Sequence, residues 1–269
     1  NTRGKSIVVS QSVQALTFRN FDMQSMTRRD FHQQALGSVL TWSLLDTLFS
    51  RNAFGDEVKL IASKWLAELN AMSLDLKGKK LEQVQWMKQV EQLLAKVDLP
   101  EMLKFIDFDA LTKDVKFQDR GELSLRPKLP KIEGLPSLVY GNQVFALNKD
   151  RSVVPHGHDN MATAFLILKG NFHGRHFDRL EDDKTHMIIR PTIDGTFGPG
   201  TYSTVTDIKD NVHWFQATED SSFIFNIHVM SVKPGATGRV YIDPNGEKLS
   251  GDRIKARKIN HAEANKLYG

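Results

Sequence analysis

The chain has 269 residues, of which 40% are hydrophobic and 25% are charged, a composition typical of a soluble globular protein with one good core and a smaller attachment. The formal net charge is only +4 and the basic residues are scattered along the chain, so nucleic acid is not an expected partner. There is no cysteine, which excludes disulfides, thiolate metal ligands and a cysteine nucleophile but names no compartment.

An upstream segment over residues 1–54 contains a candidate export signal. Residues 27–31 read Thr-Arg-Arg-Asp-Phe, with the arginine pair at Arg28 and Arg29, and a moderately apolar stretch follows over 35–49. This pattern resembles the twin-arginine signal, so we expect the twin-arginine export machinery as a partner and a periplasmic location. The alternative is an amphipathic helix on the body of a cytoplasmic protein, because an aspartate interrupts the run. The stretch is too short for a stable membrane span.

A helical segment is expected over residues 55–120. Apolar residues recur at three- and four-residue spacing in two successive stretches, as on the buried faces of helices. The two sets are Val58, Ile61, Trp65, Leu69 and Met72, and then Leu81, Val84, Met87, Val90, Leu94 and Val97. Gly78, between two lysines, separates them, and Asp98 is placed to cap a third helix that begins at Leu99. We expect these helices to pack on the outside of a β domain.

The β domain is expected over residues 121–269. A proline-dense connection over 126–136 leads into it. The expected strands are 138–147, 162–168, 172–177, 185–190, 202–206, 212–217, 223–231 and 239–242. Short strands at regular intervals predict a barrel or jelly roll. A turn over 243–246 and a final helix capped by Asn260, with Glu263 in its first turn, complete the chain.

Two histidines one residue apart carry the strongest chemical signal. His156 and His158 flank Gly157, and the extended segment that holds them would point both imidazoles to the same side. Imidazole is the commonest neutral metal ligand, so this is half of a metal site. An apolar run follows and ends at Gly170, where a turn leads into the next strand.

This spacing resembles the first motif of the cupin superfamily, in which two histidines and a glutamate bind a divalent metal inside a small β-barrel. His156, His158 and Gly170 are in register with that motif, whereas Thr163 occupies the glutamate position and Asp150 the leading glycine position. The segment around His213 is similar to the second motif of the thiol dioxygenases, the cysteine and cysteamine dioxygenase branch. In that branch three histidines hold iron, which implies a metal site of His156, His158 and His213. The fold implied is mainly β, a cupin-type barrel preceded by a helical segment.

Three neutral imidazoles leave about three positions of a six-coordinate iron open, enough for a bidentate substrate and dioxygen. Because the ligands bring no negative charge, an anionic thiolate substrate is favoured. Fe(II) is therefore the expected cofactor, with zinc, nickel or manganese as alternatives. A hydrolytic zinc site is the weaker interpretation, because Asp159 is the only candidate base near the motif.

Residues around the motif refine the expected activity. His228 resembles the histidine that follows the last iron ligand in cysteine dioxygenase, but the tyrosine expected two residues later is Met230. No arginine on the strand before His156 could hold a substrate carboxylate. The resemblance therefore implies that cysteine is a poorer substrate than a decarboxylated or larger thiol.

Trp214 and neighbouring aromatic residues are expected to keep water from the metal. His173 and His176 point to opposite faces of their strand; His173 is a replacement ligand or, more simply, a solvated strand residue. The remaining histidines, His32, His186 and His261, are interpreted as surface residues. The predicted function is Fe(II)-dependent dioxygenation of a small thiol to a sulfinate. The alternative is a cupin that binds metal or ligand without catalysis.

Overall fold

A computed structural model describes residues 56–129 and 137–269. The arginine pair at Arg28 and Arg29 lies outside these residues, so the export signal stays a prediction. Within the described ranges no helix has the length and apolar character needed to cross a membrane.

Four of the helices precede the sheets and one follows them. They are α2 (Asp56–Lys77), α3 (Gln83–Leu94), α4 (Leu99–Phe105), α5 (Phe108–Thr112) and α6 (His261–Tyr268). The expected caps are present: the Asp98 side chain accepts a hydrogen bond from the Glu101 amide at 3.0 Å, and the Asn260 side chain accepts one from the Glu263 amide at 2.9 Å. Each bond satisfies one amide that the first helical turn leaves unpaired.

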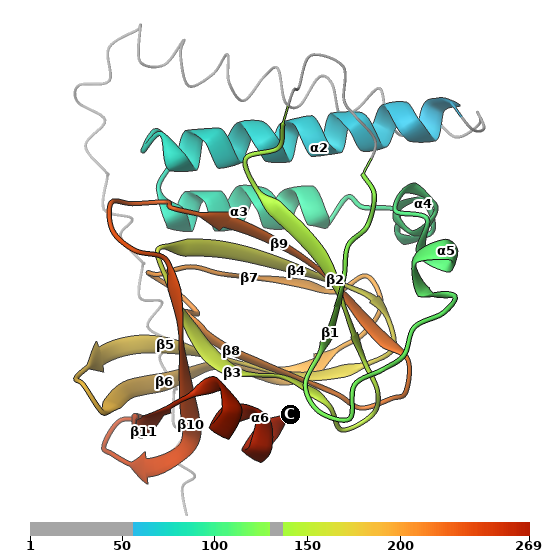
Figure 1. The fold of residues 1–269 in the computed structure, drawn as a ribbon. Coiled ribbons are helices and arrows are strands. Elements are labelled where there is room, and N and C mark those ends of the chain that lie inside the picture. The colour runs from blue at the N-terminus through green and yellow to red at the C-terminus, as the bar shows by residue number, and fades with distance from the viewer. Residues whose placement is uncertain (1–55, 130–136) are drawn as a thin grey trace, which may run out of the picture. The chain divides into compact units, whose positions relative to one another are not determined.

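The strands form two antiparallel layers. They are β1 (Leu123–Leu125), β2 (Gly141–Leu147), β3 (Ser152–Asp159), β4 (Met161–Lys169), β5 (Phe172–Asp182), β6 (His186–Phe197), β7 (Tyr202–Val205), β8 (Val212–Ala217), β9 (Ser222–Met230), β10 (Gly238–Lys248) and β11 (Ile254–Ile259). Within the described residues one sheet has the order β1-β2-β9-β4-β7, and the other closes into a barrel of order β10-β11-β6-β5-β8-β3. The prediction of a mainly β fold with a closed barrel, preceded by a helical segment, is confirmed (Figure 1).

Three apolar clusters account for the layering. In the first, α2 to α5 pack on the outer face of the five-stranded sheet, with Trp86 fully buried between them. The second fills the space between the two sheets and contains Phe165, Phe172 and Phe215. The third is a small core formed by strands of the closed barrel alone, around Met187 and Ile242. The helices thus cover the outer face of the five-stranded sheet, away from the closed barrel (Figure 1).

The strand boundaries differ from the expected ones where residues are polar on both faces. The hairpin of β5 and β6 runs well beyond the expected 172–177 and 185–190, because cross-strand pairing with two register shifts holds it together. Strands β1 and β11 were not expected. The predicted turn over 243–246 is wrong in one respect, since β10 continues through it with a bulge between Asp243 and Glu247.

The turn at Gly170 is present between β4 and β5. Its φ is +75°, a left-handed value that glycine adopts without steric penalty. A Cβ atom at this position would lie 2.1 Å from the Ser222 Oγ atom. The turn therefore needs glycine both for its conformation and for its close approach to the neighbouring strand.

Candidate metal centre

Strand register brings the three predicted ligands together. His156 lies directly opposite His213 in the pairing of β3 with β8, so their side chains share one face. His158 is two residues further along β3 and points the same way. All three are buried, with at most 4% of each residue exposed. This one antiparallel pairing thus brings together residues that lie more than fifty positions apart in the sequence.

The spacing of the ring nitrogens fits a single metal ion. One potential ligand atom from each of the three histidines lies within 4.8 Å of the others, and the Nε2 atoms of His156 and His158 are 3.2 Å apart. Metal–nitrogen bonds of about 2.1 Å at angles of about 90–110° place two ligand nitrogens about 3.0–3.4 Å apart. The observed distance falls in this interval, so His156 and His158 fit as two ligands of one ion, and His213 lies beside them as the third potential ligand.

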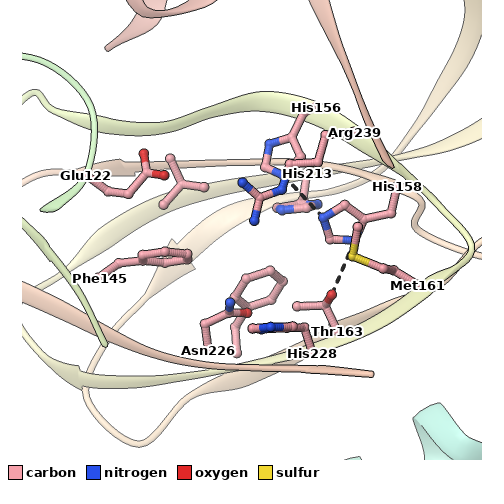
Figure 2. A pocket seen from close by; sticks show the side chains of 12 residues that line it. Glu122, Phe145, His156, His158, Met161, Thr163, His213, Asn226, His228 and Arg239 are labelled. Atoms are coloured by element: carbon pink, nitrogen blue, oxygen red, sulfur yellow. Dashed lines mark hydrogen bonds between the residues drawn. The ribbon is translucent and has the colours of Figure 1, made fainter. Parts of the chain in front are cut away.

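Hydrogen bonds orient two of the three imidazoles. The Nδ1 atom of His156 lies 2.7 Å from the Val154 carbonyl oxygen, which can only accept, so Nδ1 carries the proton and Nε2 is free to bind a metal. The Nδ1 atom of His158 lies 3.2 Å from the Thr163 hydroxyl (Figure 2). Thr163, at the position of the glutamate in the cupin motif, therefore contacts a ligand.

Burial keeps the triad neutral. It lowers the pKa of His156 from 6.5 to about 3, helped by the positive charge of Arg239. Burial also lowers the pKa of His158 and of His213 well below 6.5, and the neighbouring histidines add to the effect. Neutral imidazole is the form that binds metals, so the site is ready to bind at neutral pH without releasing protons from its ligands.

A narrow cavity adjoins the triad. Figure 2 shows the three imidazoles on one side and Phe145, Asn226 and His228 on the other. The space open to the centre of a water-sized sphere is about 10 Å³, which is room for about one water molecule. Larger molecules would need side chains at the cavity to move.

Arg239 and Glu122 also line this cavity, and neither was predicted. Arg239 lies opposite His158 in the pairing of β10 with β3, and its exposed side chain brings a positive charge beside the triad. Glu122 precedes β1, and burial raises the pKa of its carboxyl group. No local motif marks either residue, because each reaches the cavity only through the pairing of a distant strand.

The remaining candidate base is engaged elsewhere. Asp159 accepts a hydrogen bond of 2.6 Å from the Arg179 guanidinium, in an ion pair at the end of β3. Glu122 is therefore the carboxyl group that faces the cavity, in place of Asp159.

His228 lines the cavity. It lies opposite Thr163 in the pairing of β9 with β4, so it stands beside the residue that contacts His158. Burial lowers its pKa from 6.5, with smaller effects of nearby arginines. A Cβ atom on Gly141 would lie 2.2 Å from the His228 Nε2 atom, so only glycine leaves room for this ring in its present position.

Trp214 does not wall the metal site, which corrects the prediction. Its neighbours His213 and Phe215 face the cavity side of β8, and alternation along the strand turns Trp214 to the other face. There it packs against the Arg175 guanidinium, 4.1 Å from the ring centroid, and against the Tyr268 ring at 5.0 Å. It lines a second cavity of about 290 Å³ on that side. Phe145 and Phe165 are the aromatic residues at the metal cavity.

The other histidines divide clearly by exposure. His173 faces outward, with its Nε2 atom 2.5 Å from Asp194, which agrees with a solvated strand residue and removes it as a replacement ligand. His176 is fully buried and lies opposite His213 in the pairing of β5 with β8. His186 is half-buried and His261 is exposed, whereas His32 lies outside the described residues.

Comparisons with known proteins show only distant likenesses. No family model matches the sequence, and no curated protein matches it either. Among solved structures, pumpkin seed globulin has 13% identity and a TM-score of 0.35 over 49% of this chain and 31% of its own. The 11S globulin of Wrightia tinctoria, whose structure is described as revealing an auxin binding site, has 13% identity and a TM-score of 0.32 over 46% of this chain and 28% of its own.

A conserved protein with a double-stranded β-helix domain from Klebsiella pneumoniae has 14% identity and a TM-score of 0.33, over 49% of this chain and 87% of its own. The chain spans about a quarter to a third of the length of the globulins it matches.

Proposed function

We propose that the protein is a metal-dependent oxidoreductase that adds dioxygen to a small thiol. His156, His158 and His213 hold one Fe(II) ion. The reaction is RSH + O₂ → RSO₂H, in which both oxygen atoms join the sulfur, the sulfur loses four electrons and dioxygen gains them. Bound Fe(II) would supply the site at which thiolate and dioxygen meet.

The observation that carries the proposal is that, within the part of the chain that the structure describes, the buried group of potential metal ligands consists of three histidines without a carboxylate. Three neutral imidazoles leave the charge of a divalent ion uncompensated. Arg239 adds a further positive charge at the cavity. A thiolate bound through sulfur would compensate part of this charge, so the site favours an anionic sulfur ligand over a neutral one.

The residues around the ion have separate tasks. Thr163 orients His158, and Phe145 with Phe165 limits the access of water. His228, neutral at physiological pH, could accept the thiol proton on the side opposite the triad.

Arg239 bears on the choice of thiol. The strand before His156 has no arginine to bind a substrate carboxylate, which indicated a substrate without one. Arg239, however, brings a guanidinium group to the cavity from β10. Guanidinium groups bind carboxylates by paired hydrogen bonds. A thiol that carries a carboxylate is therefore the preferred substrate class in this proposal.

One observation favours a second function. The free space beside the triad is about 10 Å³, which suits a metal ion and a water molecule better than an organic substrate. A protein that holds a metal or a small ligand without turnover is the competing candidate.

The experiment is anaerobic loading of the full chain with Fe(II), exposure to air in the presence of one thiol at a time, and mass spectrometry of the thiol. We expect a gain of two oxygen atoms, which His158→Ala abolishes together with stoichiometric iron. The matched control is His173→Ala, which removes a histidine from the same barrel sheet but on its outer face and should retain activity.

Two results would contradict the proposal in different ways. If the iron-loaded protein oxidises none of the thiols, the dioxygenase proposal is wrong and the binding function remains. Full iron content in His213→Ala would show that the metal centre itself is assigned to the wrong residues.

A further inference from the structure

His213, the third proposed ligand, lacks the hydrogen bond that orients the imidazole of each of the other two. His156 and His158 each use Nδ1 in a hydrogen bond, to Val154 and to Thr163. The Nδ1 atom of His213 is buried and has no hydrogen-bond partner among the described residues. A histidine that binds metal through one nitrogen carries a proton on the other and normally donates it to an acceptor. His213 therefore needs an acceptor that the protein side chains around it do not directly provide.

His176, which lies next to His213 across the sheet, also has a ring nitrogen without a hydrogen-bond partner. His213 is paired with His156 on one side and with His176 on the other, so the three imidazoles line up across β3, β8 and β5. His176 is fully buried, and its Nδ1 atom is likewise without a partner in the described part of the chain. A buried polar atom left unpaired destabilises the folded state, because it has lost its hydrogen bonds to water and gained none in the protein. Two such atoms on adjacent residues of one face point to a shared bridging group.

The distance between the His176 and His213 rings distinguishes a direct hydrogen bond from a bridge through water. A direct N–H···N bond of about 3 Å would bring the ring centroids to about 5 Å of each other. The centroids of His176 and His213 are 6.5 Å apart, with the rings edge to face. A bent bridge through one water molecule, with two bonds of about 2.8 Å, spans such a gap.

We propose that His176 is a positioning residue for the metal centre, which holds the imidazole of His213 through one bridging water molecule. This inference rests on the proposed metal site. In it, His213 donates from Nδ1 to the water, and the water donates to Nδ1 of His176. The Nε2 atom of His176 then carries the proton and faces the Ser203 hydroxyl, 3.5 Å away in β7. The chain of contacts links the metal ligand to the opposite sheet.

Packing alone does not explain a histidine here. The His176 ring stacks on Phe197 at 6.1 Å and meets Phe215 edge-on at 5.5 Å. An apolar ring would make the same contacts without burying an unpaired nitrogen. His176→Phe should therefore preserve the fold while removing the bridge.

The first test measures Zn(II) affinity of the full chain by competition with a chelator, with zinc as a redox-silent probe. We expect His176→Phe to bind zinc about 10- to 100-fold more weakly than the unaltered protein. His176→Asn, whose amide can replace Nδ1, should recover most of the loss. The matched control His173→Phe makes the same change on the outer face of the same strand and should bind normally.

The second test uses the unaltered protein and so does not depend on how the variants fold. In ¹⁵N-histidine spectra of the zinc-bound chain, we expect His213 to be protonated at Nδ1 and His176 at Nε2. A proton on Nδ1 of His176, or zinc affinity in His176→Phe equal to that of the unaltered protein, would overturn the inference alone. Failure of the unaltered protein to bind either Zn(II) or Fe(II) would instead overturn the proposed metal centre.

Discussion

Acid should destabilise the metal-free protein strongly, because four buried histidines are neutral in the folded state. Burial lowers the pKa of His156 to about 3 and that of His176 to about 4, and it lowers the pKa of His158 and His213 well below 6.5. In the unfolded chain each returns to about 6.5. Below that pH the unfolded state binds protons that the folded state cannot, so stability falls as the pH falls.

The magnitude follows from the unfolded state. At about pH 5.5, one unit below the unfolded pKa, each histidine that stays neutral on folding costs about 1.4 kcal/mol. Four of them together remove about 5 kcal/mol relative to about pH 7.5. Domains are stable by only about 5–15 kcal/mol in total. The metal-free protein is therefore expected to be close to unfolding near pH 5.5.

The assay is urea denaturation of metal-free protein at several pH values, followed by tryptophan fluorescence. His176→Phe removes one of the four groups and should reduce the loss of unfolding free energy by about 1.4 kcal/mol. A total loss below about 2 kcal/mol would refute the reasoning, since it would mean that water or protons reach the triad in the folded state.

Three further predictions concern separate parts of the chain. Gly170→Ala should lower the free energy of unfolding in urea by about 1–3 kcal/mol, because φ is +75° and the new Cβ would meet Ser222. The control Gly195→Ala, with open space around it, should lower that free energy by less than about 1 kcal/mol. Arg239→Gln should raise KM about tenfold for a carboxylate-bearing thiol and leave KM for an aminothiol without a carboxylate unchanged; equal effects on both would contradict a role in carboxylate binding. Replacing Arg28 and Arg29 together by lysine should retain the protein in the cytoplasm, as cell fractionation would measure, and unchanged export would favour a packed helix instead.

Local rules were sufficient for several features. The period of two along a strand predicted that His156 and His158 share a face, and the capping preferences of Asp98 and Asn260 placed two helix starts. The same alternation also excludes Trp214 from the cavity once His213 is taken as a ligand, because adjacent strand residues point to opposite faces. The sequence by itself is therefore sufficient to place Trp214 on the face away from the metal.

Other features depend on contacts between segments far apart in the chain. Arg239 reaches the cavity from β10, and Glu122 reaches it from the position just before β1; no local pattern specifies the pairing partners of these two strands. His173 and His176 differ in burial because β5 presents one face to the second sheet and the other to the outside, and this choice is made by the pairing of β5 with β8. Sequence determined which residue types could bind a metal and which of them share a strand face. Tertiary structure alone decided which side chains surround them, because strand register and sheet closure are properties of the whole barrel.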